Sequence, residues 1–345
     1  MNNNITNPAF ESFRMAGLFT LALRLVVGWT YFSAFWRRLF LANKLDPESA
    51  GYIGQKFNHF LPNALGIQPL IEYMVTHPDT LWWAMASFTI IEGILGLLFM
   101  LGAFTRLMSI GVFGLAMGIL LGAGWLGTTC LDEWQIGVLG VAAGFTIFFS
   151  GSGTYSLDYW LLRNKASWRD SRAFSFLGSG VLPLSYRNLS KIIGIGALAI
   201  LGLTLFTNQY FHGGVWGELH NKSVKPKIEI ADAQLTDQVL QFEIYRTEGV
   251  DVYGSFLIGM SLRADTKDVF WELNSEDLAS LPKDFIDNKY LVQVRPGANS
   301  LEIPLGAKAM LSINDPEFEN LPPGTYSLTL TDISGAEWSV SLQKQ

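Results

Sequence analysis

Apolar residues gather in five long stretches in the first 210 positions, and short alternating segments follow. The stretches span about residues 15–40, 80–102, 105–126, 134–150 and 191–210. A bilayer core of about 30 Å needs around 20 apolar residues in a helix. We therefore predict five transmembrane helices, the fourth beginning at an interfacial Trp134.

Small residues predict how these helices pack. Two helices carry glycines at three- to four-residue spacing, at Gly114, Gly118 and Gly122 and at Gly137, Gly140 and Gly144. Such stripes let helix backbones approach closely. Short connections predict antiparallel neighbours in a four-helix core. The proline-punctuated connection 41–79 is expected to be a loop folded over the outer mouth.

From residue 226 the pattern changes to strands. Alternation occurs at 227–230, 240–244, 291–294 and 326–330, separated by turn residues such as Pro296-Gly297 and Ser334-Gly335. About seven short strands in 120 residues indicate an all-β, immunoglobulin-like sandwich. We expect a membrane α-helical bundle at 1–190 with a segment 151–190 on its inner side. A fifth helix and an interfacial junction would follow at 191–225, and the sandwich at 226–345.

Charge separates the two parts. Only 16% of the residues are charged, against roughly 25% in soluble domains. From Pro226 onward there are nine Lys/Arg against 19 Asp/Glu, whereas the remainder has 15 against 11. The acidic tail would repel phosphates, so no nucleic acid is expected as a partner.

Basic residues also predict the orientation. With the N-terminus inside, Arg106, Arg163, Lys165, Arg169 and Arg172 all fall in inner connections. The positive-inside rule then favours a cytoplasmic N-terminus and a periplasmic tail, in a bacterial inner membrane.

Two ionisable residues lie deep in predicted helices. Arg24 lies about 18 Å from Trp36 and Glu92 about 15 Å from Trp82, at 1.5 Å per residue. Because isolated charges are costly there, we expect Arg24 and Glu92 to pair or to line a polar cavity. The pair is either a structural ion pair or the wall of a substrate or quinone cavity.

Helical phase places Tyr31 and Arg38 on the stripe of Arg24. Arg37 falls on nearly the opposite face and is expected to anchor lipid headgroups. A simpler interpretation makes both Arg37 and Arg38 interfacial side chains that extend to water.

The outer connections concentrate further reactive groups. They comprise Cys130, Asp132, Glu133 and Trp134 before the fourth helix, and His212, Trp216, His220 and Asn221 after the fifth. Each also has a structural explanation: packing for the cysteine, the helix dipole for the carboxylates, and interfacial anchoring for the aromatic residues and histidines. Cys130 is the only cysteine, which excludes an intramolecular disulfide and multi-cysteine metal sites.

A family resemblance joins these residues. The segments Arg-Leu-Val-Val-Gly-Trp-Thr-Tyr (24–31), Trp36-Arg37-Arg38 and Thr-Cys-Leu-Asp-Glu-Trp-Gln (129–135) resemble DoxD, a membrane subunit of thiosulfate:quinone oxidoreductase related to the DoxX-like four-helix family. The segment 211–221 and the β-tail resemble DoxA, its partner subunit. The chain thus resembles a DoxD–DoxA fusion.

The resemblance implies that two thiosulfates are coupled to tetrathionate while membrane quinone, menaquinone or ubiquinone, takes the electrons. Cationic Arg38, Arg37, His212 and His220 would offset the repulsion between two dianions. Cys130 would hold one sulfur equivalent covalently. We assign further candidate roles at the substrate site to Asp132, Glu133, Trp134, Trp216 and Asn221. Quinone would lie near Arg24, Glu92, Trp29 and Tyr31, with no haem, flavin, iron–sulfur cluster or metal.

Two other functions fit the same pattern. A membrane-anchored binding or assembly protein would use the sandwich to recruit a periplasmic partner, since fold does not settle function. Transport of a small sulfur oxyanion would need a polar path through the bundle. The bundle has few internal charges, so this function is the least favoured. A homo-oligomer is compatible with all three functions.

Overall fold

The computed structural model of the chain describes residues 8–49, 51–127, 132–164, 171–251, 254–264 and 269–344. The fold divides into two compact units. The first, a helical unit, comprises Met1–Ala50, Trp82–Gly124 and Leu131–His220. The second comprises Gly51–Leu81, Trp125–Cys130 and Asn221–Gln345. A stretch in the middle of the helical sequence therefore belongs to the same unit as the C-terminal strands.

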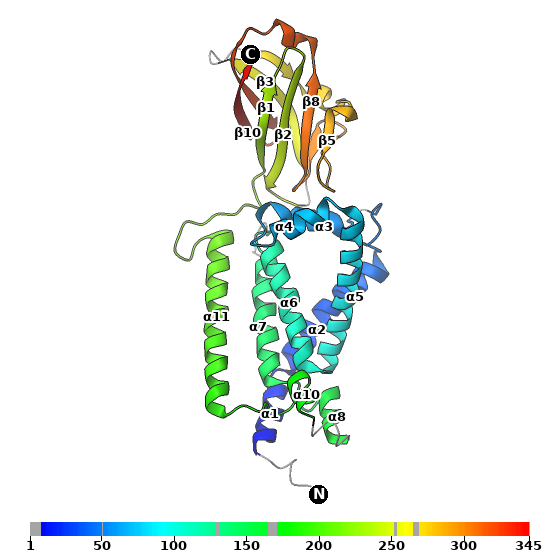
Figure 1. Cartoon of the computed structure of the whole chain (residues 1–345), viewed down its shortest axis with the longest axis vertical. Helices are drawn as coiled ribbons and strands as arrows, with labels where there is room; N and C mark the ends of the chain where they lie inside the picture. Colours follow the sequence, from blue (N-terminus) through cyan, green and yellow to red (C-terminus); the bar gives the residue numbers. More distant parts are fainter. Residues whose placement is uncertain are drawn as a thin grey trace. The chain divides into compact units, whose positions relative to one another are not determined.

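Long apolar helices build the helical unit (Figure 1). Among the described residues, four helices are long and apolar enough to cross a membrane, or five if one bent pair counts as a single span. The helices of this unit are α1 (Pro8–Phe19), α2 (Leu21–Trp36), the π-helix η1 (Arg37–Leu41), α5 (Pro78–Leu101), α6 (Thr105–Ala123), α7 (Asp132–Ser150), α8 (Leu157–Asn164), α10 (Arg172–Leu177) and α11 (Tyr186–His212).

The first predicted helix, 15–40, is not continuous. It is bent by 53° between α1 and α2, around Thr20. The Thr20 hydroxyl bonds to Ala16 O at 3.1 Å and lies 3.1 Å from Ser150 Oγ. Nearby, a Cβ on Gly17 would lie 2.1 Å from Gly153 N, so the two backbones touch. The apolar pattern predicted the length of this segment correctly. It did not predict the bend, which lies next to the close contact between Gly17 and Gly153.

The two glycine stripes differ in what they face. On α7, a Cβ built on Gly137 would lie 2.8 Å from the Cβ of Leu120 on α6, and one built on Gly140 would lie 2.7 Å from the Cβ of Ala116. The α7 stripe therefore packs against α6, as predicted. On α6, Gly118 has nothing within 4 Å of a built Cβ, and the same holds for Gly114. Only one of the two stripes therefore brings helices together at these positions.

This difference predicts opposite effects of one substitution. Gly137→Ala forces a methyl group into Leu120 and should lower the free energy of unfolding by about 1–3 kcal/mol. Gly118→Ala adds a methyl group in open space and should be neutral or slightly stabilising. Thermal unfolding of both variants in detergent measures this, and equal losses would contradict the packing described.

The second unit begins with helices where a loop was expected. The connection 41–79 contains α3 (Ile53–Phe60), the 3-10 turn η2 (Leu61–Asn63) and α4 (Gln68–Val75), and α5 already starts at Pro78. The sequence pattern did not predict these short helices within the connection. Pro62 and Pro69 stand in the first turns of η2 and α4, where a missing backbone N–H costs nothing.

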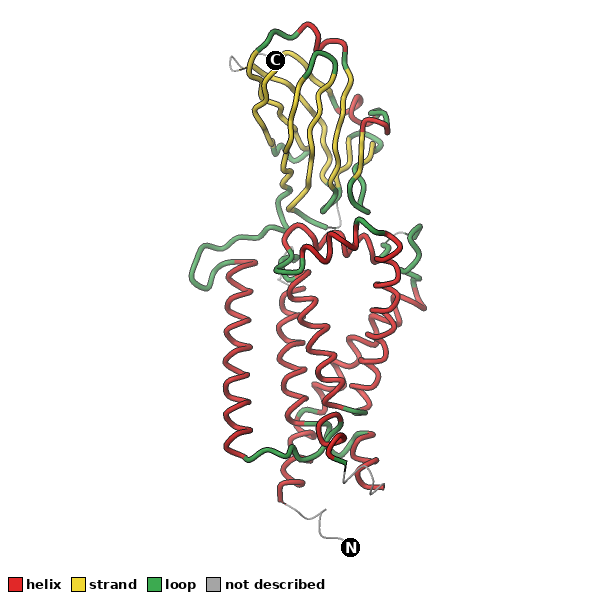
Figure 2. Tube along the Cα trace, viewed as in Figure 1, coloured by secondary structure: helices red, strands yellow, loops and turns green. Residues whose placement is uncertain are grey.

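The C-terminal strands are yellow in Figure 2. They form one continuous sheet in the order β5-β8-β2-β1-β10-β9-β3-β7-β6, with β4 beside β3. Its two ends are tied by Asn288, whose side chain bonds both Val294 O and Val294 N, at 3.0 Å and 2.7 Å. The sheet is thus nearly closed and barrel-like, and the immunoglobulin-like sandwich is not confirmed. The strands are β1 (Lys227–Leu235), β2 (Val239–Glu248), β3 (Ser255–Ala264), β4 (Val269–Leu273), β5 (Ile286–Asn288), β6 (Arg295–Pro296), β7 (Leu301–Ile303), β8 (Lys308–Asn314), β9 (Gly324–Asp332) and β10 (Glu337–Lys344).

Three of the four strands predicted from alternation are present, and the segment 291–294 is not a strand. Its backbone bonds go to side chains instead: Val292 N donates to Asn58 Oδ1 at 3.0 Å, and Val294 N donates to Asn288. Val292 and Val294 are still buried in the core of the β-region. The alternation of apolar and polar residues at 291–294 therefore predicted correctly which side chains are buried. It did not predict that the backbone bonds side chains instead of a neighbouring strand.

Candidate functional site

The helical unit contains an ion pair between the partly buried Arg38 and the buried Glu92. Arg38 Nη1 lies 2.7 Å from Glu92 Oε2 and donates to Thr89 Oγ1 at 3.1 Å. Arg38 comes from η1, whereas Thr89 and Glu92 lie one turn apart on α5. Glu92 is 4% exposed, so the carboxylate is stabilised by protein contacts and not by water.

The expected Arg24–Glu92 pair is not formed. Arg24 Nη1 and Nη2 donate to the carbonyls of Ser152 and Tyr155, at 2.7 Å and 2.5 Å, in the segment after α7. Arg106 acts in the same way on Phe148 O and Gly180 O. Both arginines thus bind carbonyls at and beyond the C-terminal end of α7, where the helix dipole favours cations. Arg24 is a structural anchor and not a neighbour of Glu92.

Tyr31 carries a buried polar atom that is unusual for its surroundings. The side chain is 4% exposed, and its hydroxyl has no hydrogen-bond partner among the residues that the structure describes. The ring packs with Phe99 and Val112, and the hydroxyl would lie 3.0 Å from a Cβ on Gly140. Buried polar groups are normally satisfied, so this one is a candidate ligand contact.

Trp29 and Arg37 lie on the surface of the same helical segment. Trp29 is 55% exposed and its ring contacts Phe32. Arg37 is exposed and its Nε donates to Ser33 O at 3.3 Å. Neither residue lines the interior next to Tyr31, although sequence reasoning grouped Trp29 with it.

The end of α11 is held against α6 and α7 by side chains from the junction. His212 is buried, with Nε2 at 2.9 Å from Gly124 O. Trp134 Nε1 donates to Thr207 Oγ1 at 3.0 Å, and its ring meets the His212 ring edge-on at 6.4 Å. His212 and Trp134 therefore both hold the end of α11, while the other ring nitrogen of His212, Nδ1, is buried without a hydrogen-bond partner among the described residues.

The junction after α11 folds back on itself. Gln209 Oε1 accepts from the backbone N–H groups of Val215, Trp216 and Gly217, at 3.0, 2.8 and 3.1 Å. His220 N donates to His212 O at 2.9 Å, which closes the loop. The Trp216 and His220 side chains remain exposed on it.

Asn221 holds the chain just before the loop that carries the cysteine. Asn221 Nδ2 and Ser223 Oγ both donate to Gly127 O, at 2.9 Å and 2.6 Å. Gly127 N donates in return to Ser223 Oγ at 3.1 Å. Cys130 and the side chain of Asp132 lie outside the described residues. Asp132 and Glu133 open α7, a position where the helix dipole favours negative charge.

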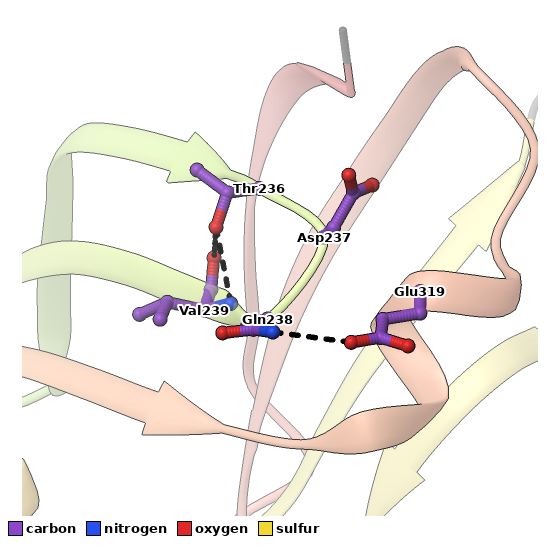
Figure 3. A pocket seen from close by; sticks show the side chains of 5 residues that line it. All are labelled: Thr236, Asp237, Gln238, Val239 and Glu319. Atoms are coloured by element: carbon purple, nitrogen blue, oxygen red, sulfur yellow. Dashed lines mark hydrogen bonds between the residues drawn. The ribbon is translucent and has the colours of Figure 1, made fainter.

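A hollow at the β1–β2 turn is lined by Thr236, Asp237, Gln238, Val239 and Glu319 (Figure 3). Gln238 Nε2 donates to Glu319 Oε1 at 3.2 Å, and Asp237 pairs with Lys344 at 3.0 Å. Two carboxylates against one lysine leave this hollow acidic. It is therefore unsuited to an anionic substrate.

Comparison with protein families identifies both halves of the chain. Residues 19–185 match the model described as TQO small subunit DoxD, and residues 211–341 match TQO small subunit DoxA. The chain belongs to the thiosulfate:quinone oxidoreductase family. It is a DoxD domain and a DoxA domain fused in one polypeptide, and most of α11 lies between the two matches.

Three contact residues were missed by sequence reasoning. Thr89 precedes Glu92 by three residues, the spacing that places two side chains on one helix face, and this could have been noticed. Ser223 and Gln209 bond backbone groups brought near them by the turn of the junction. No sequence spacing indicates such contacts in advance.

The DoxD domain contains one polar group suited to a quinone carbonyl. Within the described ranges, no group of three or more His, Cys, Asp or Glu is placed to hold a metal ion. The unsatisfied Tyr31 hydroxyl, in contrast, suits a carbonyl oxygen, the polar group of a quinone ring.

The partner of Glu92 can be tested by double-mutant cycles. Arg38→Met and Glu92→Leu should each destabilise the protein by about 3–5 kcal/mol, because each leaves a buried charge unpaired. The double variant should lose much less than the sum of the two. Arg24→Met combined with Glu92→Leu should be additive within about 0.5 kcal/mol.

Unfolding of the reconstituted protein in increasing denaturing detergent gives these free energies. Coupling of Glu92 to Arg24, without coupling to Arg38, would contradict the ion pair described.

Proposed function

We propose that the protein oxidises two thiosulfate ions to tetrathionate and transfers the two electrons, with two protons, to a membrane quinone. The observation that carries this proposal is the unsatisfied, buried Tyr31 hydroxyl in the same helical unit as the Arg38–Glu92 ion pair, inside a domain of the DoxD type. A polar group without a partner in an apolar bundle offers a binding contact for an apolar ligand with a carbonyl.

The proposed orientation places the N-terminus in the cytoplasm and the DoxA domain in the periplasm of a bacterial inner membrane. Support comes from Arg106, Arg163 and Arg172, which lie in connections that this orientation makes cytoplasmic. Thiosulfate would then react on the outer side, and quinone would enter from the lipid.

On the quinone side, we assign Tyr31 as the hydrogen-bond donor to one carbonyl oxygen. Arg38 holds the Glu92 carboxylate in place, and we assign this carboxylate as the group that accepts or delivers a proton during reduction. Trp29 is exposed on α2 and offers a ring contact on the lipid side, not in the interior. Arg24 has no part in this site.

On the thiosulfate side, the positive charges divide differently from the sequence prediction. Arg38 is already neutralised by Glu92, and His212 is fixed by Gly124 O. Arg37 and His220 remain exposed and are the cations we assign to the approach of a dianion. We assign Trp216 to the same exposed face of the junction, and Asn221 to positioning of the chain that leads to Cys130.

A covalent step at Cys130 balances the reaction. The thiol sulfur forms an S–S bond with the outer sulfur of one thiosulfate while two electrons pass to quinone, which takes up two protons and leaves as quinol. A second thiosulfate then attacks that outer sulfur, tetrathionate leaves, and the Cys130 thiolate is restored. Asp132 and Glu133, next in sequence, are assigned as acceptors of the thiol proton.

The purified protein should form quinol and tetrathionate in equal amounts from thiosulfate and a short-chain quinone. Tyr31→Phe should raise the KM for quinone about tenfold, the value of one hydrogen bond of roughly 1.4 kcal/mol. The rate of thiosulfate oxidation with ferricyanide, a soluble acceptor, should be unchanged.

Tyr186→Phe, an exposed position, is the matched control. Absence of quinol above a heat-treated sample would refute the proposed activity. An unchanged KM in Tyr31→Phe would refute only the role of Tyr31.

Cys130→Ser should abolish tetrathionate formation with both acceptors, because a hydroxyl cannot form the S–S bond. Mass spectrometry of the wild-type protein incubated with thiosulfate and quinone should show one thiosulfate-derived adduct on Cys130, the only cysteine. Full turnover in Cys130→Ser would remove the covalent step and leave the activity itself intact.

A further inference from the structure

Contacts between α2 and α5 divide the helical bundle into two different halves. A Cβ built on Gly28 of α2 would lie 2.7 Å from Met100 Cβ and 2.9 Å from Gly96 O, and one built on Gly96 would lie 2.5 Å from Phe32 N. Backbone therefore lies against backbone in this half, and no water fits between the two helices at these positions. We call the end of the bundle at which α8 and α10 lie the inner end, and the opposite end, at η1, the outer end (Figure 1).

The same contacts set the depth of Glu92. This residue precedes Gly102, just after α5 at the inner end, by ten residues, which is about 15 Å of helix. In order from the inner end, the residues that face each other are Arg24 and Gly102, Gly28 and Met100, Phe32 and Gly96, Phe35 and Gly93, and Arg38 and Glu92. Close contacts therefore separate Glu92 from the inner end, whereas Arg38 is its neighbour toward the outer end.

Apolar side chains fill the inner half of the bundle. Phe99, Val112 and Ile147, from α5, α6 and α7, are fully buried and pack in one cluster with the Tyr31 ring. Each of the three lies within about two turns of the inner end of its helix. Because a proton moves along polar groups or waters, these described side chains offer it no path from the inner end to Glu92.

Positive charge adds a second barrier at the inner end. Arg24 and Arg106 are buried there and donate to main-chain carbonyls, Arg24 Nη1 at 2.7 Å and Arg106 Nη2 at 2.6 Å. Asp158, also buried, accepts instead from Phe104 N and Thr105 N, at 2.7 Å and 2.9 Å. Two arginines against one carboxylate leave a net positive charge among these groups. Such a charge repels protons, as fixed arginines do in selective pores.

The outer end differs because its charges are balanced. Arg38 Nη1 and Glu92 Oε2 lie 2.7 Å apart, and the two side chains are 14% and 6% exposed. Arg38 stands on η1, directly after the exposed Trp36 and Arg37. The pair carries no net charge, and its arginine is the more accessible partner. It therefore lacks the electrostatic barrier of the inner end.

We propose that the protons of quinone reduction enter from the outer end, past Arg38 to Glu92, and that the inner end is closed to them. This inference rests on the proposed thiosulfate–quinone activity. In that reaction two thiosulfates, one quinone and two protons give one tetrathionate and one quinol. Electrons and protons then come from the same side of the membrane, so turnover moves no net charge across it.

The helices around Glu92 carry few other titratable groups. Of these, Arg38 is the one that forms an ion pair with Glu92 in the described part of the chain. The charged residues and the tyrosine on these helices are Arg24 and Tyr31 on α2, Arg37 and Arg38 on η1, Asp79 at the start of α5, Arg106 at the inner end of α6, and Asp132 and Glu133 at the start of α7.

The full-length protein in sealed vesicles tests this. Thiosulfate is added outside and stays there, because a dianion does not enter hydrocarbon, so only molecules with the outer end facing outward react. A short-chain quinone is supplied in the membrane. A pH dye trapped in the lumen, a pH electrode outside and a voltage-sensitive dye follow the protons and the charge. We expect the outer solution to lose two protons per tetrathionate, while the lumen pH and the membrane voltage stay constant.

The rate of turnover gives a second readout. Changing the pH of the outer solution should change the wild-type rate, whereas changing the lumen pH alone should not. An uncoupler, which removes proton gradients and voltage across the membrane, should leave the rate unchanged, because no gradient opposes turnover.

Glu92→Gln keeps a polar side chain but cannot carry a proton. The rate should fall about a hundredfold or more, and the remaining rate should no longer respond to the outer pH. Asp79→Asn, at an exposed carboxylate at the start of the same helix, is the matched control and should behave as the wild type. A response to the outer pH retained in Glu92→Gln would overturn the assignment of Glu92 as the entry point.

The vesicle experiment separates this inference from the activity on which it rests. A lumen that becomes alkaline, with a voltage negative inside, would overturn the outer entry of protons and leave the thiosulfate–quinone activity standing. Vesicles that form no tetrathionate, with or without the uncoupler, would refute the activity and this inference with it.

Discussion

The cost of a polar group without a partner in an apolar interior governs the arrangement of this protein. Inside the helical unit, the buried Arg24 and Arg106 donate to main-chain carbonyls, and the partly buried Arg38 donates to Glu92. The same rule operates in the second unit, where Asn58 serves two backbone groups at once. The hydroxyl of Tyr31 is an exception to this rule, as are Arg24 Nε and His212 Nδ1 in the same unit, and the Tyr31 hydroxyl makes no hydrogen bond at all with the described residues.

Much of the fold could be predicted from residue patterns. Hydropathy located the membrane helices, and alternation located β1, β2 and β9, because burial on one face imposes a period directly on the sequence. The hydrogen-bond and ion-pair partners of the buried charges were harder to predict from the sequence. Arg24 and Glu92 have similar calculated depths, but depth alone did not predict that Arg24 would turn to the carbonyls after α7. The π-helix at Arg37–Leu41, which carries Arg38, has no period that hydropathy can reveal.

The helices in 51–81 show why domain boundaries in sequence and in space differ. Their residues interrupt the membrane segments along the chain, yet they pack as part of the β-region. The sequence pattern predicted a loop here because each helix has only eight residues and prolines stand at the starts of η2 and α4. Short amphipathic helices gain most of their stability from the surface on which they pack, and that surface lies more than 150 residues later in the sequence.

The amide of Gln209 has a consequence for how such a fusion can arise. All the backbone bonds described for the turn 213–220 are made with residues between Asn208 and His220, so the turn can form as soon as this short stretch has been synthesised. It requires no matching surface on either neighbour. A linker of this kind can be added between two existing genes without redesigning either product, and it adds little to the search that each part must complete during folding.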